Sequence, residues 1–175
     1  MRNLALAFLF LVAATGLRAE ENATFTVGAY KFSRPADWKW IEPTSSMRKA
    51  QLQIPGKDGG APADVVFFFF GEGQGGGVQA NVERWLGQFT DKKDAGQTEP
   101  LDVNGTKVTL VSTEGTMKAS PFGGQPQDQP GSGLLGAIVE HPEGAVFVKM
   151  TGPAALVKQS REKFIAMVKA AAAAK

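Results

Sequence analysis

Residues 65–89 read VVFFFFGEGQGGGVQANVERWLGQF, and this stretch decides the fold. Its first six residues form a continuous apolar run of β-branched and aromatic side chains, which is typical of a central strand covered on both faces. After the glycine-rich segment 71–77, apolar residues recur along one helical stripe at Val78, Val82, Trp85, Leu86 and Phe89. A strand buried on both faces needs helices against it, and this stretch supplies the first one.

A second helix is predicted to begin near Pro153, because proline is favoured at the first helical position. Its buried stripe comprises Leu156, Val157, Ser160, Phe164, Met167 and Val168. The alanine run 170–174 is expected to fray into solvent, since nothing in it can anchor against a core. We expect Phe68, Trp85 and Phe164 to meet across the sheet and the two helices.

The remaining patterns predict strands and turns. Residues 24–32 change their apolar phase after Gly28, which indicates one bulged or bent strand. Alternation over 47–54 predicts a half-buried strand with Ala50, Leu52 and Ile54 inward.

Two hairpins are predicted further along the chain. Asn104-Gly105, between 101–103 and 107–111, is a strong hairpin signal, and the turn 141–144 joins strands 134–139 and 145–150. Segment 119–133 is rich in glycine, proline and glutamine without any period, so it is predicted to be a long mobile loop. Hairpins in place of regular strand–helix–strand alternation predict an α+β fold with a mainly antiparallel sheet and two packed helices.

Some of these segments resemble a known family. The segment FSRPADW (32–38), which follows an aromatic strand, is similar to the strand–proline–tryptophan entry of PsbP-like proteins. GGGVQANVERWLGQF (75–89) and VKMTGP (148–153) resemble uncharacterised exported bacterial proteins of this type. The resemblance implies an α/β/α sandwich that serves as a non-enzymatic accessory or interaction module, and it carries over no functional residue.

The first nineteen residues predict export. A charged start at Arg2 precedes an apolar run of signal-peptide length that is too short to span a bilayer, and cleavage is expected after Ala19 or, alternatively, after Gly16. We therefore expect a secreted or periplasmic protein without a stable membrane anchor, with residues 20–175 as a single domain. The mature chain holds no cysteine, so its stability depends on its core and not on disulfides.

Charge and composition limit the classes of partner and cofactor that the sequence gives reason to expect. The full chain has 19 basic and 17 acidic residues, and loss of Arg2 and Arg18 with the leader leaves it formally neutral. A neutral chain without a basic block gives no reason to expect nucleic acid as a partner. One histidine and no cysteine also give no reason to expect a metal or a cofactor.

The segment Gly71-Glu72-Gly73-Gln74-Gly75-Gly76 matches the G-x-G-x-x-G pattern between a strand and a helix. A dinucleotide site would need a parallel strand repeat, which the other elements do not indicate. A loop that binds an anion or a partner through backbone N–H groups is the favoured functional interpretation, and a flexible connection is the structural one. Asn81, Arg84 and Gln88 are neighbours on the polar face of the first helix, either as a solvated face or as a recognition surface.

The tryptophan pair and the single histidine each allow a functional and a structural interpretation. Trp38 and Trp40 share one face of a strand, which suits either a sugar-stacking platform or a core pair. His141 is interpreted as a solvated turn residue, because a catalytic role would need partners that the sequence does not place.

The sequence as a whole predicts an exported, non-enzymatic accessory or binding domain for an unknown protein or a small anionic ligand. Its contacts are expected through the glycine-rich loop 71–77 and loop 119–133. The predicted contact residues are Gly73, Gly75, Gly76, Asn81, Arg84 and Trp38. The alternatives are an envelope hydrolase with two convergent carboxylates and a carbohydrate-binding domain.

Overall fold

The computed structural model describes residues 23–119 and 126–174. Within them lie ten strands, two α-helices and one short 3₁₀ helix, Lys57–Gly59. The strands are β1 (Thr24–Val27), β2 (Tyr30–Ser33), β3 (Lys39–Trp40), β4 (Arg48–Ile54), β5 (Ala63–Phe69), β6 (Phe89–Thr90), β7 (Gln97–Val103), β8 (Thr106–Met117), β9 (Gln129–Val139) and β10 (Val146–Pro153). The helices are α1 (Val78–Leu86) and α2 (Ala154–Ala173).

Eight of the strands form one sheet in which every pairing is antiparallel. The order is β3-β4-β5-β10-β9-β8-β6, and β7 also pairs with β8. The predicted α+β architecture is confirmed, and β5 lies in the interior of the sheet, between β4 and β10, as its apolar run indicates. Because β5 is antiparallel to both β4 and β10, the glycine-rich segment after it does not belong to a parallel nucleotide-binding unit.

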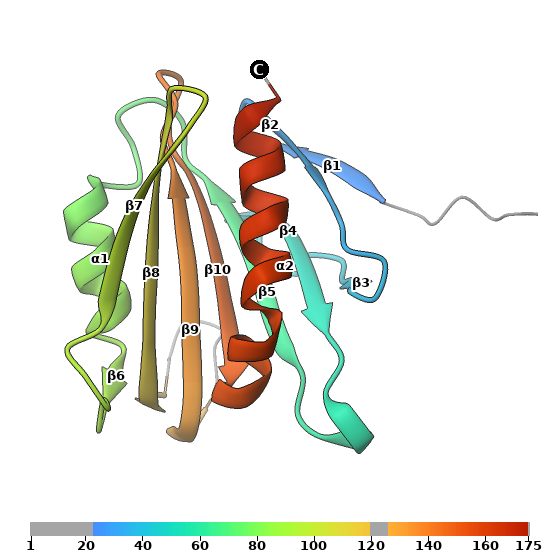
Figure 1. Cartoon of the computed structure of the whole chain (residues 1–175), viewed down its shortest axis with the longest axis vertical. Coiled ribbons are helices and arrows are strands. Elements are labelled where there is room, and N and C mark those ends of the chain that lie inside the picture. The colour runs from blue at the N-terminus through green and yellow to red at the C-terminus, as the bar shows by residue number, and fades with distance from the viewer. Residues whose placement is uncertain (1–22, 120–125, 175) are drawn as a thin grey trace, which may run out of the picture.

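The sheet separates two hydrophobic cores. Helix α2 and the β1–β2 hairpin cover one face, where Phe164 packs with Phe67 and Leu135. Helix α1 covers part of the other face, where Trp85 packs with Phe147 and Ile138. Figure 1 shows the long helix α2 lying in front of the sheet and the short helix α1 beside β7 and β8.

The expectation that Phe68, Trp85 and Phe164 meet is wrong. Phe68 is half-buried against the cluster of Trp85, whereas Phe164 belongs to the cluster on the opposite face. Successive side chains of a strand point to opposite faces, so Phe67, and not Phe68, is on the side of Phe164.

The expected single strand 24–32 is a hairpin instead. Strands β1 and β2 pair from Thr24↔Ser33 to Val27↔Tyr30, and Gly28 at the turn has φ +56°. A side chain at Gly28 would lie 2.8 Å from the ring of Phe69, so the phase change in the sequence marks a tight turn against the sheet.

The alanine run does not fray. Helix α2 extends to Ala173, with Ala171 and Ala172 buried in the core. The hydroxyl of Thr106 donates a hydrogen bond to the carbonyl of Ala172 at 3.2 Å, which holds the last turn on the start of β8. Small side chains allow the helix to approach the sheet closely here.

Both predicted hairpins are confirmed, at Asn104-Gly105 between β7 and β8 and at residues 141–144 between β9 and β10. Asn104 and Gly105 have φ +52° and +80°, as the two central residues of a type I′ turn require. The predicted loop 119–133 is too long at its C-terminal end, since β9 already begins at Gln129. Residues 120–125 of that loop lie outside the described residues.

Helix α1 ends at Leu86, one turn before the predicted stripe does. The N–H of Gly87 donates a hydrogen bond to the carbonyl of Glu83 at 2.8 Å and closes the last turn. Phe89 belongs to strand β6 and is buried there. In the described part of the chain, neither helix has the length and apolarity needed to cross a membrane. The predicted leader, residues 1–19, lies outside the described residues.

Candidate functional site

The glycine-rich loop 71–77 adopts a backbone path that residues with side chains rarely take. Gly71, Gly73, Gly75 and Gly76 have φ of +93°, +66°, +84° and +82°. A Cβ at Gly75 would lie 2.8 Å from Phe70 and 2.9 Å from Phe147, so the loop also lies close to aromatic side chains of the sheet. The glycine content therefore has a steric cause at this position.

Asn81 on α1 holds the loop from inside. It is only 3% exposed, and its side-chain amide donates to the carbonyls of Gly75, Gly76 and Gly77 at 2.9, 3.2 and 3.0 Å. The guanidinium of Arg84 donates to the Oδ1 atom of Asn81 at 2.9 Å, which fixes the orientation of the amide. Of the three residues that the sequence places as neighbours, Asn81 and Arg84 are thus joined, with Asn81 as a buried support and not as a solvated residue. Gln88 lies beyond the end of α1, where its side chain accepts from Lys149.

This arrangement sets the direction of three backbone N–H groups. In a trans peptide the C=O and the N–H of the following residue point in opposite directions, and the described chain has no cis peptide. Since the carbonyls of residues 75–77 converge on Asn81, the N–H groups of Gly76, Gly77 and Val78 point away from it. No side chain caps the N-terminus of α1 at Gly77.

The turn between β9 and β10 forms the opposite wall. A Cβ at Gly144 would lie 2.5 Å from the backbone of Gly71, so turn and loop pack backbone against backbone. The ring of His141 packs edge-on against Tyr30 at 5.5 Å between centroids, and the hydroxyl of Tyr30 donates to the carbonyl of Glu140 at 2.7 Å. Burial raises the pKa of Tyr30, which keeps this hydroxyl protonated and able to donate at neutral pH.

The tautomer of His141 follows from its neighbour. The backbone N–H of Glu143 donates to His141 Nδ1 at 3.2 Å, so in the neutral imidazole Nδ1 is the acceptor and Nε2 carries the hydrogen. His141 therefore contributes a second kind of hydrogen-bond donor to this end of the sheet.

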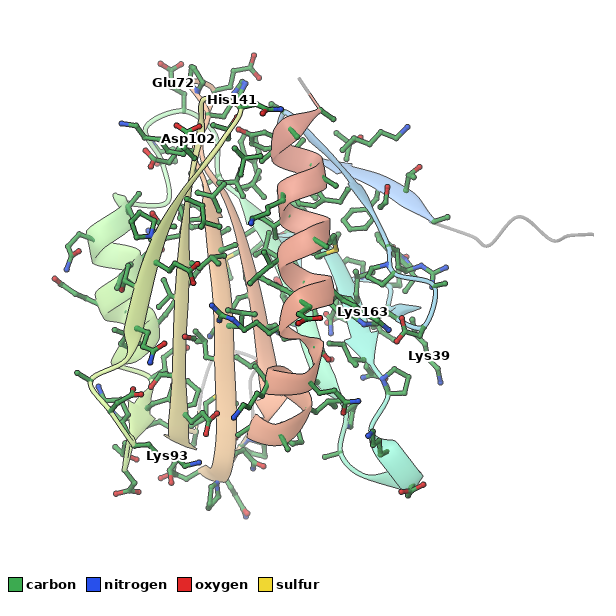
Figure 2. All side chains as sticks on the ribbon, viewed as in Figure 1. Lys39, Glu72, Lys93, Asp102, His141 and Lys163 are labelled. Carbon is green, nitrogen blue, oxygen red and sulfur yellow. The ribbon has the colours of Figure 1, made fainter. Side chains whose placement is uncertain are left out.

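Loop and turn enclose a pocket of about 310 Å³. Its walls are formed by two groups of residues, Gly73, Gln74, Gly76, Gly77 and Val78 from the loop side and Ile138, Glu140, His141, Pro142, Gly144 and Ala145 from the strand and turn. Figure 2 shows Glu72 and His141 at the same end of the sheet. The pocket is small, but its volume is within the range of small-ligand sites.

The predicted contact residues are distributed unequally around this pocket. Gly73 and Gly76 line it, while Gly75, Asn81 and Arg84 stand behind the lining and shape it. Trp38 is elsewhere and 1% exposed, so its indole offers no face to a sugar. Trp40 is half-buried with its ring 5.3 Å from Phe25, which makes the tryptophan pair part of the core.

The described residues of the second predicted contact loop lie at the other end of the sheet. Gln129 begins β9, whose far end leads into His141, so loop 71–77 and the segment 126–133 do not form one continuous surface. Sequence reasoning missed the turn 141–144 as part of the site. The signal was the glycine at 144, but its contact with Gly71 depends on a pairing of β5 with β10 that no local pattern specifies.

Comparisons with known proteins give the fold. No family model matches the sequence, and no curated protein matches it. The solution structure of cyanobacterial PsbP (CyanoP) from Synechocystis sp. PCC 6803 is similar with a TM-score of 0.53 at 9% identity, covering 80% of this chain and 84% of that one. A protein of unknown function from Pseudomonas aeruginosa, PA94, described as a putative regulator, is similar with a TM-score of 0.50 at 10% identity, covering 83% of this chain and 92% of that one. The chain therefore has a PsbP-like fold, as the resemblance in its sequence implied.

Proposed function

We propose that this protein is an exported binding domain that recognises a small anionic group, a carboxylate or a singly charged phosphate, in the pocket between loop 71–77 and turn 141–144. The observation that carries the proposal is the convergence of three loop carbonyls on Asn81. It turns the N–H groups of Gly76, Gly77 and Val78 away from Asn81 at the N-terminus of α1, where free N–H groups can bind an anion.

The electrostatics support an anion of low charge. The uncapped N-terminus of α1 adds a positive partial charge, and His141, which lines the pocket, carries a hydrogen-bond donor at Nε2. Glu140 also lines the pocket, and its carboxylate opposes a dianion more strongly than a monoanion.

The chemistry of the lining supports binding over catalysis. The pocket has one imidazole and one carboxylate, and none of its lining residues carries a hydroxyl or a thiol that could act as a nucleophile. The accessory role of a non-enzymatic module fits this composition.

The test is a titration of the ¹⁵N-labelled mature protein with sodium acetate and with inorganic phosphate, against sodium chloride at equal ionic strength. We expect saturating amide shifts at Gly76, Gly77 and Val78 with either anion, at dissociation constants of about 1–10 mM for such small probes. Glu140→Gln should strengthen phosphate binding, because it removes the opposing charge.

Asn81→Ala removes the group that orients the loop and should abolish the saturating shifts. The Asn81→Ala variant also loses buried hydrogen bonds, so a second variant is needed. His141→Phe removes the Nε2–H donor and keeps an aromatic ring beside Tyr30. Gln79→Ala, on the exposed side of α1 and outside the pocket lining, is the matched control. Shifts that grow linearly up to about 50 mM, or that are equal for chloride, would overturn the proposal.

A further inference from the structure

A second cleft lies at the other end of the sheet, between the first turns of α2 and strands β7, β8 and β9. Its volume is about 380 Å³, larger than that of the glycine-loop pocket. Lys93, which lines this cleft, is at the end of the sheet opposite Glu72 and His141 in Figure 2. The two pockets therefore cannot hold parts of one small ligand.

The base of this cleft is apolar. Leu135 of β9 and Val157 of α2 line it with 1% and 6% of their surface exposed, and both belong to the core between α2 and the sheet. The side chain of Leu134 belongs to the cluster on the opposite face of the sheet and adds nothing to this base. A compact aliphatic or aromatic group placed here would lie against the exposed edge of Val157.

Most of the charges at the rim are already paired. Lys93 binds Glu114 at 2.7 Å, and Arg161 binds Glu99 at 2.8 Å across the gap from α2 to β7. These pairs neutralise one another, so they give the rim no net preference for either sign of charge.

Two lining side chains of opposite charge are left without an ion-pair partner among the described residues. Lys158, one turn before Arg161 on the wall formed by α2, has no hydrogen bond or ion pair to any described residue. Asp94, on the wall formed by the loop before β7, accepts a hydrogen bond from the N–H of Gly96 at 2.8 Å and has no cationic partner among the described residues. The lining also includes the hydroxyl of Ser112 and the amide of Gln97, and neither is engaged by another described side chain.

We propose that this cleft binds a free apolar α-amino acid. The apolar side chain would occupy the base at Leu135 and Val157, the carboxylate would face Lys158, and the ammonium group would face Asp94. The ligand class follows from the composition of the cleft, because a zwitterion with an apolar substituent offers a partner to Lys158, to Asp94 and to the apolar base.

Ligands with a single charge satisfy this cleft less well. An apolar carboxylate would place its charge near Lys158 but leave Asp94 close to an anion and without a cation. An apolar amine would face Asp94 but leave Lys158 close to a cation and without an anion. Like charges in proximity lower affinity, while opposite ones raise it.

The test compares three probes in titrations of ¹³C-methyl-labelled protein: leucine, 4-methylpentanoate, which lacks the ammonium group, and 3-methylbutylamine, which lacks the carboxylate. We expect leucine to shift the methyl signals of Leu135 and Val157 with a dissociation constant of about 1 mM. Each single-charge probe should bind about threefold to fivefold more weakly, which is the range of an exposed ion pair.

Two exposed substitutions assign the charges. Lys158→Gln should weaken leucine and 4-methylpentanoate but not 3-methylbutylamine, and Asp94→Asn should weaken leucine and 3-methylbutylamine but not 4-methylpentanoate. The asparagine keeps an oxygen for the N–H of Gly96, so the turn is preserved. Lys169→Gln on α2 and Asp91→Asn in the same loop are matched controls outside the cleft lining.

Equal affinity for leucine and 4-methylpentanoate would overturn the zwitterion assignment. The absence of saturation by all three probes at about 20 mM would overturn the site itself. Neither result bears on the anion pocket at loop 71–77, because that pocket is tested by other amides and other probes.

Discussion

Gly75 is the residue at which the glycine-rich loop is least free to change. Its φ is +84°, and a methyl group there would approach the rings of Phe70 and Phe147 to 2.8 and 2.9 Å. Alanine at Gly75 would therefore be strained both in its backbone angle and in its side-chain contacts.

Gly75→Ala is therefore expected to lower the free energy of unfolding by about 2–4 kcal/mol, combining backbone strain with overpacking. Gly73→Ala is the matched control, since Gly73 also has positive φ (+66°) but open space where its Cβ would lie. It should cost only about 1–2 kcal/mol. Urea denaturation of both variants measures the difference, and equal losses would show that the aromatic contact carries no energy.

Lys149 is a second residue under strain, because its environment disfavours the charged form that lysine usually takes. It projects from β10 to the same face as Phe147, and its ammonium group donates to the side chain of Gln88. Burial lowers the pKa of Lys149 to about 8, and the positive charge of nearby Arg48 lowers it in the same direction. A charged lysine held in this position therefore destabilises the folded state at neutral pH.

The sign of the pH dependence follows from this lowered pKa. Between pH 8 and the ordinary lysine pKa of 10.5, the unfolded chain binds a proton that the folded one has lost, so the contribution of Lys149 to stability rises with pH. Lys149→Met should be more stable than the natural chain at pH 7, by up to about 3 kcal/mol, and this advantage should shrink toward pH 10. Chemical denaturation at pH 6, 7, 8, 9 and 10 tests it, and a difference independent of pH would contradict it.

At the scale of an element, α2 shows how tertiary contacts extend a helix beyond the pattern that predicts it. The run 170–174 has no large apolar side chain, yet Ala171 and Ala172 are buried. The carbonyl of Ala172 accepts a hydrogen bond from the hydroxyl of Thr106. Alanine has the highest intrinsic helix propensity, so the run needs only a surface to lie against. The start of β8 provides that surface.

Adjacent alanines in this run should therefore respond differently to the same substitution. Ala171→Lys would bury an ammonium group against the sheet and is expected to cost more than about 2 kcal/mol. Ala170→Lys, at an exposed position, should stay within about 0.5 kcal/mol of the natural chain. Thermal denaturation of the two variants is the measurement, and equal melting temperatures would mean that the last turn of α2 is detached in solution.

At the scale of the whole molecule, the sheet divides the core into two clusters that share no side chain. Trp85 lies in the cluster under α1, with its ring 6.5 Å from that of Phe147, and Phe164 lies in the cluster under α2. Among the described residues, the backbone of the strands lies between the two clusters. Their contributions to stability should be separable.

A pair of double-mutant cycles tests this division. Trp85→Leu and Phe164→Leu should be additive within about 0.5 kcal/mol, whereas Trp85→Leu and Phe147→Leu should show a coupling of about 0.5–1.5 kcal/mol from their ring contact. Coupling between Trp85 and Phe164 larger than that between Trp85 and Phe147 would show that the sheet transmits repacking from one face to the other.

The sequence determined those features that depend on neighbours along the chain. The apolar run 65–70, the stripe from Val78 to Leu86 and the Asn104-Gly105 turn each predicted their element, because periodicity and turn chemistry are local properties. Local patterns failed at the turn of Gly28 and at the alanine run, where the deciding contacts come from Phe69 and Thr106, far away in the sequence. They also failed for the expected meeting of Phe68, Trp85 and Phe164, which lie on two faces of the sheet.

Only the tertiary structure decided what surrounds the candidate sites. The sequence pointed to Gly73, Gly75, Gly76, Asn81 and Arg84, but the pairing of β5 with β10 brings turn 141–144 against them. Strand alternation places Phe67 and Phe68 on opposite faces of the sheet, but only helix docking decides that Phe67 faces α2. The cleft between α2 and strands β7–β9 has no signature in the chain, since Asp94, Ser112 and Lys158 come from separate elements. Such sites arise from strand pairing and helix docking, and these depend on burial summed over the whole molecule.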